Sequence, residues 1–260
     1  MATPRPTRRA APAQLAAYVL HHHDWSESSL ILELYTRELG RIAAVAKGAK
    51  RPTSQLRCVL LPLQRIQIAL GSKRIEDGAE VQLLRSAEWA GGAAMPGGAA
   101  LLAGLHLNEL LLRGLARNDP HPRLFDRYAA TLPSLVHPDD SQVAAALRAF
   151  EIHLLAETGV LPELNRVTAT QRPVQPEARH QLHAEAGICV AAPRDSGILG
   201  ETLIALQRAL DADDLGALQR TCLAAPLDLK GQLRGLLHYH LGTSMLRTRA
   251  LMVEVQQLLE

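Results

Sequence analysis

Six short apolar runs occupy the first third of the chain and are separated by polar or glycine-containing turns. The runs cover residues 18–20, 30–35, 42–46, 56–61, 66–70 and 81–84. Runs of this length between turn residues are typical of β-strands. A small closed barrel suits them because closure leaves no exposed strand edge. We therefore predict a five-stranded barrel of the oligonucleotide-binding (OB) type over residues 13–88.

The hydrophobic pattern changes to a helical period after a glycine-rich segment, 89–98, where we place the domain boundary. Apolar stripes at helical spacing then predict three helices that form an antiparallel bundle. Further helices are expected to pack on that bundle, which makes the fold class α+β with a helical domain over 89–260. The predicted helices cover residues 101–115, 124–135, 142–155, 199–210, 213–223, 227–240 and 243–259.

Two segments depart from these patterns. Residues 1–12 contain three prolines and three arginines, and we predict a mobile basic tail there. Residues 162–197 contain several prolines and few periodic apolar positions, so we expect an irregular or hairpin insert. A hairpin over 180–192 would turn at Ala186 and Gly187.

The charge of the chain is unevenly divided. The net charge is +2 overall, but residues 1–85 carry +6 and the remainder carries −4. The basic half coincides with the predicted barrel, where Arg41, Lys47, Lys50 and Arg51 surround the flexible Gly48 position. Clustered cations beside a bend favour contact with phosphate groups.

Several classes of chemistry find no support in the sequence. The phosphate-loop, dinucleotide-binding and nucleophile-elbow patterns are all absent, and no pair of carboxylates can be singled out. His21–His23 and the pair His238 and His240 lack accompanying metal-ligand motifs. We therefore predict no enzyme activity, no catalytic residue, no cofactor and no metal. A nuclease or ligase-like barrel is the remaining enzymatic alternative, and it lacks an acidic metal-binding cluster.

The number and spacing of the cysteines and the hydropathy of the chain indicate the cellular compartment that we expect. The three cysteines, Cys58, Cys189 and Cys222, are widely spaced and odd in number, which fits reduced thiols rather than a disulfide framework. No apolar run approaches the ~20 residues of a membrane span. We expect a cytoplasmic, nucleoid-associated protein without a membrane partner.

Several segments, taken in order along the chain, together resemble the RecO family of bacterial recombination mediators. They include Trp25-Ser-Glu-Ser-Ser-Leu30, Val45-Ala-Lys-Gly-Ala-Lys50, Leu147-Arg-Ala-Phe-Glu151 and the closing Leu241-Gly242. The resemblance implies an OB barrel, a helical C-terminal domain and a role without catalysis. It also implies binding of single- and double-stranded DNA, strand annealing, contact with RecR, and help in loading RecA onto DNA coated by single-stranded DNA-binding protein (SSB).

The resemblance further implies that the helical domain receives the acidic, apolar C-terminal tail of SSB, with Arg148 at the position of a tail-binding arginine. One departure concerns metal. Some relatives carry a four-cysteine zinc module, whereas this region holds only Cys189, so zinc is not carried over.

Two hypotheses follow from the residues. In the first, the barrel binds DNA, with Trp25 or Tyr35 as stacking candidates, although filling the barrel is the favoured role for both rings. The cations assigned to this surface are Arg41, Lys47, Lys50, Arg51 and Arg57. In the second, the chain is mainly an adaptor whose helical groove binds a partner peptide, with DNA contact secondary. Its candidate residues are Arg148, Arg113 and Arg127, and for the last two an ordinary surface role is favoured.

Overall fold

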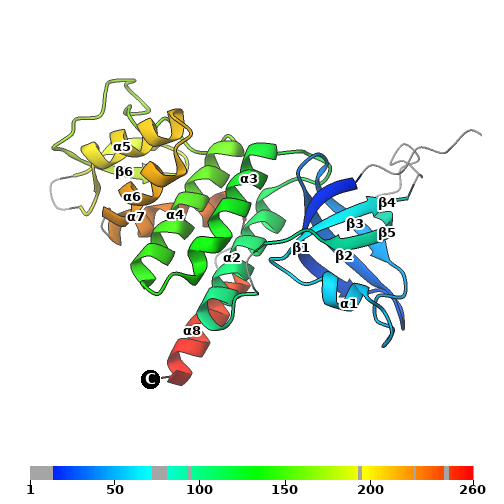
Figure 1. Cartoon of the computed structure of the whole chain (residues 1–260). Coiled ribbons are helices and arrows are strands. Elements are labelled where there is room, and N and C mark those ends of the chain that lie inside the picture. The colour runs from blue at the N-terminus through cyan, green and yellow to red at the C-terminus, as the bar shows by residue number, and fades with distance from the viewer. Residues whose placement is uncertain are drawn as a thin grey trace, which may run out of the picture. The chain divides into compact units, whose positions relative to one another are not determined.

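The computed structural model describes residues 14–71, 81–92, 95–192, 195–224, 227–242 and 246–259. The chain divides into two compact units, Met1–Gly92 and Ala93–Glu260, which we call the barrel unit and the helical unit (Figure 1). The basic tail predicted for residues 1–12 lies outside the described residues.

The barrel unit contains five strands that close on themselves in the order β1-β2-β3-β5-β4. The pairs are antiparallel except β3 with β5, which is parallel. This arrangement confirms the predicted OB-like barrel. The strands are β1 (Gln14–Asp24), β2 (Leu30–Thr36), β3 (Gly40–Ala46), β4 (Arg65–Leu70) and β5 (Val81–Trp89).

Aliphatic side chains from all five strands fill the barrel. Alternate residues point inward, so Leu32 and Leu34 of β2 enter the core together with Ile66 and Ile68 of β4. Gly40, at the start of β3, has a φ of +68°. This left-handed conformation fits the turn that the sequence predicts there.

The strand predicted over 56–61 is wrong, because the segment begins with a short helix, α1 (Leu56–Val59). Leu56, Val59 and Leu60 are spaced as on one face of a helix, and all three pack against the barrel core. The intervening Arg57 and Cys58 are exposed. A short continuous apolar run does not distinguish a strand from a single helical turn.

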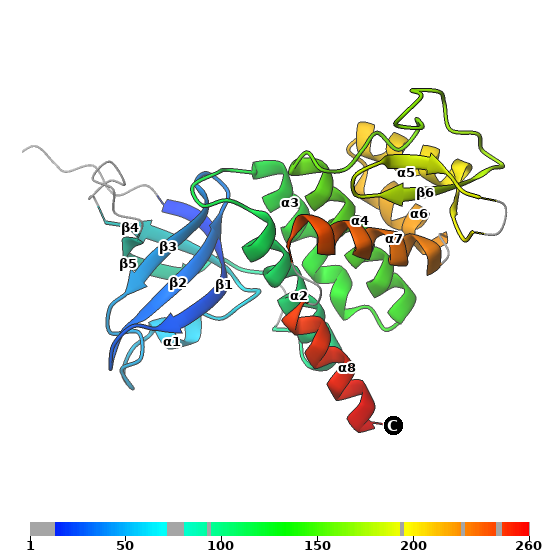
Figure 2. The same cartoon turned by 180° about the vertical axis from the view of Figure 1, so that it is seen from behind.

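The helical unit confirms the predicted helical domain (Figure 2). α4 lies at its centre and packs against helices from both halves of the unit. Its core contains Leu107, Phe125, Tyr128 and Phe150, all fully buried or nearly so. The helices are α2 (Gly98–Gly114), α3 (Pro122–Thr131), the 3-10 helix η2 (Leu132–Val136), α4 (Asp140–Glu157), α5 (Gly200–Asp211), α6 (Leu215–Ala224), α7 (Leu227–His240) and α8 (Arg247–Leu259).

A small three-stranded sheet lies between α4 and α5 in the chain. β6 (Arg179–His183) pairs with β7 (Gly187–Val190) on one side and β8 (Ile198–Leu199) on the other. The hairpin expected over 180–192 corresponds to β6 and β7, with Gly187 at a φ of +67°. Thr168 binds the start of β7, since its Oγ1 accepts the N–H of Ile188 at 2.8 Å.

Candidate functional site

The loop that leaves β3, residues 47–55, presents cations to solvent, and we call it the basic loop. Gly48 adopts a φ of +72°, and the N–H of Arg51 donates to the Gly48 carbonyl at 3.1 Å. This turn folds the Arg51 side chain over Gly48. Lys47 and Arg51 are both exposed, and Arg57 follows on the exposed face of α1. These three cations are therefore accessible to a phosphate backbone.

Lys50 has a different role in the same loop. Its Nζ forms an ion pair with Oδ2 of Asp24 at 3.1 Å and donates to the carbonyl of Ser26 at 3.3 Å. Its backbone N–H donates to the carbonyl of Ser28 at 3.0 Å. Lys50 thus fastens the β1–β2 loop, which carries Trp25, to the basic loop.

The two aromatic candidates differ in accessibility. Trp25 is 64% exposed, so it does not fill the barrel and its ring is free to meet a base. Tyr35 is fully buried, on the face of β2 opposite to Leu32 and Leu34. A buried ring offers no stacking surface, and the geometry therefore favours Trp25 alone of these two.

Arg41 is the least accessible of the predicted DNA-binding cations. Its side chain is 17% exposed, and Nη1 lies 3.5 Å from Oε2 of Glu33 on the neighbouring strand β2. An arginine held against a carboxylate on the barrel wall is less available to phosphate than the residues of the basic loop.

The helical unit contains a groove of about 470 Å³, which we call the helical groove. Its walls come from α4, α6, α7 and α8, with His106 contributed by α2. Most of the lining is apolar, and cations surround it. The apolar residues are Ala144, Ala145, Leu147, Leu223, Leu229, Leu237, Leu246, Met252 and Val253, and the basic residues are Arg148, Lys230, Arg234, His238 and Arg249.

The basic residues of the groove act on one another. Burial lowers the pKa of Arg249, and the positive charges of Arg234 and Arg148 lower it further. Burial, Arg249 and Arg234 likewise lower the pKa of His238. Glu151 is the one carboxylate among the described residues that line the groove. A bound anion would relieve the mutual repulsion of Arg148, Arg234 and Arg249, so the groove is suited to an acidic ligand.

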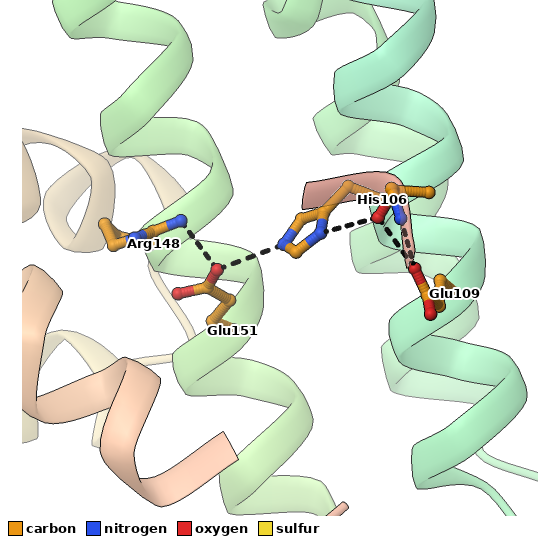
Figure 3. Close-up of polar contacts among 5 residues, drawn as sticks. His106, Glu109, Arg148 and Glu151 are labelled. Atoms are coloured by element: carbon orange, nitrogen blue, oxygen red, sulfur yellow. Dashed lines mark hydrogen bonds and ion pairs between the residues drawn. The ribbon is translucent and has the colours of Figure 1, made fainter. Parts of the chain in front are cut away.

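A chain of polar contacts holds Arg148 in the groove (Figure 3). Its Nη2 donates to Oε1 of the buried Glu151 at 2.6 Å. The same oxygen lies 3.5 Å from Nε2 of His106, whose Nδ1 lies 3.2 Å from the hydroxyl of Thr248 in α8. The contacts therefore join α4, α2 and α8, and they fix the guanidinium at one wall of the groove.

Two buried atoms of the Arg148–Glu151 pair have no hydrogen-bond partner among the described residues. They are Nε of Arg148 and Oε2 of Glu151. Buried polar atoms are usually paired with protein groups, water or a ligand, so Nε of Arg148 is a donor that none of the described residues uses.

The other two predicted tail-binding arginines do not line the groove. Arg113 donates to Oε1 of Glu109 at 3.0 Å on its own helix. Arg127 forms an ion pair with Asp213, in the turn between α5 and α6. Both arginines therefore pair with carboxylates that lie outside the groove lining.

The sequence did not identify three of the groove cations as candidate binding residues. They are Lys230, Arg234 and Arg249. Lys230 and Arg234 are four residues apart on α7 and thus share a helix face, beside the apolar Leu229 and Leu237. This spacing was available in the sequence. What was missing was the packing of α7 against α4 and of α8 against α2.

Cys222 lines the groove but is not a reactive group. Burial raises the pKa of its thiol to about 12, with a further contribution from Glu151. The thiol is therefore protonated near neutral pH and poorly nucleophilic. No cluster of metal-ligating side chains occurs within the described residues, and none of the helices described there is long and apolar enough to cross a membrane.

Both units match one protein family. Residues 12–92 match the family described as "Recombination protein O N terminal", and residues 96–250 match "Recombination protein O C terminal". The chain belongs to the RecO family of DNA repair proteins. The two RecO matches meet within the 89–98 segment, close to the division between the barrel and helical units.

Curated RecO relatives cover nearly the whole chain. The DNA repair protein RecO of Polaromonas sp. strain JS666 is 51% identical over 244 residues, which span 93% of this chain and 96% of the relative. The DNA repair protein RecO of Albidiferax ferrireducens is 49% identical over 244 residues, spanning 93% and 95%. That of Acidovorax ebreus is 49% identical over 255 residues, spanning 93% and 96%.

Proposed function

We propose that the chain is a recombination mediator that holds DNA on its barrel and the C-terminal tail of SSB in its helical groove. In this role it binds single- and double-stranded DNA and anneals complementary strands. Together with RecR it helps to load RecA onto SSB-coated DNA. Membership of the RecO family supports this assignment, and so does the separation of a basic barrel surface from a basic, apolar groove.

The observation that carries the proposal is the composition of the groove. An acidic, apolar tail needs a hydrophobic surface for its side chains and cations for its carboxylates. The groove offers Leu147, Leu229 and Leu237 for the first, and Arg148 and Arg234 for the second. Guanidinium groups pair with carboxylates through two parallel hydrogen bonds, which adds orientation to the attraction.

On the barrel, the proposal assigns DNA contact to Lys47, Arg51 and Arg57, with Trp25 as a stacking residue. Lys50 supports the surface by holding the β1–β2 loop. Few aromatic side chains are available, and we therefore expect electrostatic attraction to dominate the affinity for DNA.

Isothermal titration with a peptide that carries the SSB tail tests the groove assignment. We expect the wild-type chain to bind the peptide and Arg148→Ala and Arg234→Ala each to weaken binding by about 10-fold or more, since each removes a charge-assisted contact. Arg208→Ala is the matched control, because Arg208 is exposed on α5 and does not line the groove. Equal affinity for all four proteins would remove the groove from the proposal.

The adaptor alternative, in which DNA contact is secondary, is distinguished by annealing of complementary strands coated with SSB. The mediator proposal predicts that Lys47→Ala combined with Arg51→Ala slows annealing while peptide binding is unchanged. Annealing at the wild-type rate would favour the adaptor.

A further inference from the structure

Trp89, the last residue of β5, has a large aromatic side chain that is exposed to solvent. It is 62% exposed, and Trp25 is 64% exposed. The chain has only two tryptophans, and both therefore lie exposed in the barrel unit. By contrast, Phe125 and Phe150, the two phenylalanines, are buried. Exposing both of the largest rings is unusual in a chain with 3% aromatic residues.

A β-bulge determines where the Trp89 ring lies. The register of β4 and β5 shifts between the pairs Leu70–Leu84 and Ala69–Ser86. Beyond this shift Trp89 stands directly opposite Ile66, a fully buried residue of the barrel interior. Opposite residues share one face of a sheet, so Trp89 emerges from the inner face at the end of the strand. Bulges often redirect a side chain at a functional site in this way.

The ring is held at one edge and is otherwise accessible. Its Nε1 donates to Oε1 of Gln64 at 3.3 Å. Gln64 precedes Arg65, the exposed first residue of β4, whose carbonyl accepts the N–H of Ala90 at 3.0 Å. Successive side chains of a strand point to opposite faces, so Glu88 lies on the face of β5 opposite to Trp89. The ring therefore lies on the face of the sheet opposite to the one that carries Arg65 and Glu88.

Strand directions place Trp89 at the same end of the barrel as the basic loop. β5 runs parallel to β3, and β1 and β5 both run antiparallel to β4. Strands β1, β3 and β5 therefore all end on one side. Trp25 follows β1, the basic loop follows β3, and Trp89 ends β5. Trp89 thus ends β5 on the same side of the barrel as the basic loop, and the β1–β2 hairpin that carries Trp25 extends on that side beyond the last pair of β1 with β4, Tyr18 with Arg65.

We propose that Trp89 is a second stacking residue for the bases of single-stranded DNA, in addition to Trp25. The inference rests on the proposed DNA binding by the barrel. The net charge of +6 over residues 1–85 favours a polyanion over an uncharged apolar partner. Every base has an aromatic face, so such a residue adds affinity without demanding a sequence.

Tryptophan fluorescence provides the test, because the chain has only these two reporters. In the Trp25→Phe variant all the emission comes from Trp89. We expect oligo-dT to quench this emission and an abasic strand of equal length to leave it unchanged. Stacking contributes about 1–3 kcal/mol per base. Trp89→Ala is therefore expected to weaken oligo-dT binding by roughly 5- to 150-fold, and Trp89→Phe by much less.

The outcomes separate this inference from the proposed function. If the Trp25→Phe variant binds oligo-dT without quenching and Trp89→Ala binds as tightly as wild type, the inference is wrong and DNA binding stands. If Trp89→Ala weakens binding of the abasic strand equally, the residue acts through the fold and the inference is again wrong. If the wild-type chain binds no DNA at all, both proposals fail.

Discussion

Thr248, in the first turn of α8, donates both its backbone N–H (2.9 Å) and its hydroxyl (2.8 Å) to Oε2 of Glu109 on α2. The other carboxylate oxygen accepts the backbone N–H of Arg247 at 2.9 Å. The first N–H groups of a helix have no partner within the helix. A carboxylate at that position satisfies them and interacts favourably with the helix dipole. Glu109 therefore caps α8 from a neighbouring helix.

We predict that Glu109→Gln lowers the free energy of unfolding by about 1–2 kcal/mol, in the range of a lost helix cap. The glutamine loses the charge and one of the two acceptors. Urea denaturation measures the effect, and Glu163→Gln, an exposed carboxylate paired with Arg166, is the control. Because α8 forms one wall of the helical groove, the variant is also expected to bind the tail peptide more weakly. Unchanged unfolding and unchanged peptide affinity would contradict the capping role.

The same cap depends on pH. Burial raises the pKa of Glu109, but the hydrogen bonds from Thr248, Arg247 and Arg113 outweigh burial and leave the pKa below its ordinary value. The stability that the carboxylate contributes is thus fully present above the unfolded-state pKa and is lost as the pH falls through the lower folded-state pKa. Glu109→Gln should flatten the stability curve of the wild type in that acidic range.

His153 on α4 is predicted to make the helical unit less stable below neutral pH. Burial, together with the positive charges of Arg127 and Arg123, lowers the pKa of its ring to about 4, against the opposing effect of Asp213. The unfolded chain takes up a proton near pH 6.5 and the folded chain only near pH 4. Stability is therefore lost as the pH falls through this window, by roughly 3 kcal/mol in total.

Urea denaturation at pH 7 and pH 5 checks the prediction for His153. We expect His153→Gln to reduce the difference in unfolding free energy between the two pH values by about 2 kcal/mol. His183→Gln, which alters an exposed histidine of β6, is expected to leave the difference unchanged. Equal pH dependence in the wild type and His153→Gln would show that the ring is protonated without cost.

The barrel could be predicted from the sequence because its strands are short apolar runs between turn residues, as at Gly40. The segment 56–61 could not be assigned correctly, because Leu56, Val59 and Leu60 satisfy both a strand and a helical turn. Only the barrel core, against which all three pack, selects the helix. The helices of the second unit followed from leucine periodicity over stretches long enough to exclude strands.

The candidate sites were predicted less completely, because pairing and exposure depend on tertiary contacts. The sequence suggests that Arg127 is an ordinary surface cation. The structure shows that it pairs with Asp213, which lies 86 residues away in the sequence. Trp89 falls in a glycine-rich linker by composition, and only the register of β4 and β5 identifies it as the exposed end of a strand. Arg148 was identified through family resemblance. The groove around it could be identified only from the packing of the helices.

The basic loop is predicted to set the salt dependence of DNA binding. Each phosphate contact with a single strand contributes about 0.7 to the slope of log affinity against log salt concentration. Lys47→Ala combined with Arg51→Ala is therefore expected to reduce the slope by roughly 1.4. Lys50→Ala should change it less, because Lys50 already pairs with Asp24. Arg37→Ala, in the β2–β3 turn at the other end of β3, is a control that removes one positive charge outside the loop. If the double variant has the same slope as the wild type, the basic loop does not contact DNA phosphates.

Glu151 is predicted to restrain the affinity of the helical groove for acidic peptides. Its carboxylate is the one negative charge among the described groove-lining residues, and it lies against Arg148, at 2.6 Å from Nη2. Glu151→Gln removes this charge, while the amide oxygen still accepts the hydrogen bond that positions the guanidinium. The cations of the groove then attract an approaching carboxylate more strongly. After screening by solvent and salt, the gain is on the order of 1 kcal/mol.

Isothermal titration with the tail peptide should therefore show binding roughly 5-fold tighter for Glu151→Gln than for the wild type, a gain that shrinks as salt is added. Glu157→Gln removes a charge from the same helix outside the groove, and it should leave the affinity unchanged. Glu151→Ala removes the hydrogen bond as well as the charge, so its affinity should fall below that of Glu151→Gln. Weaker binding by Glu151→Gln than by the wild type would mean that the full charge of Glu151 is required to orient Arg148, and the restraining role would be wrong.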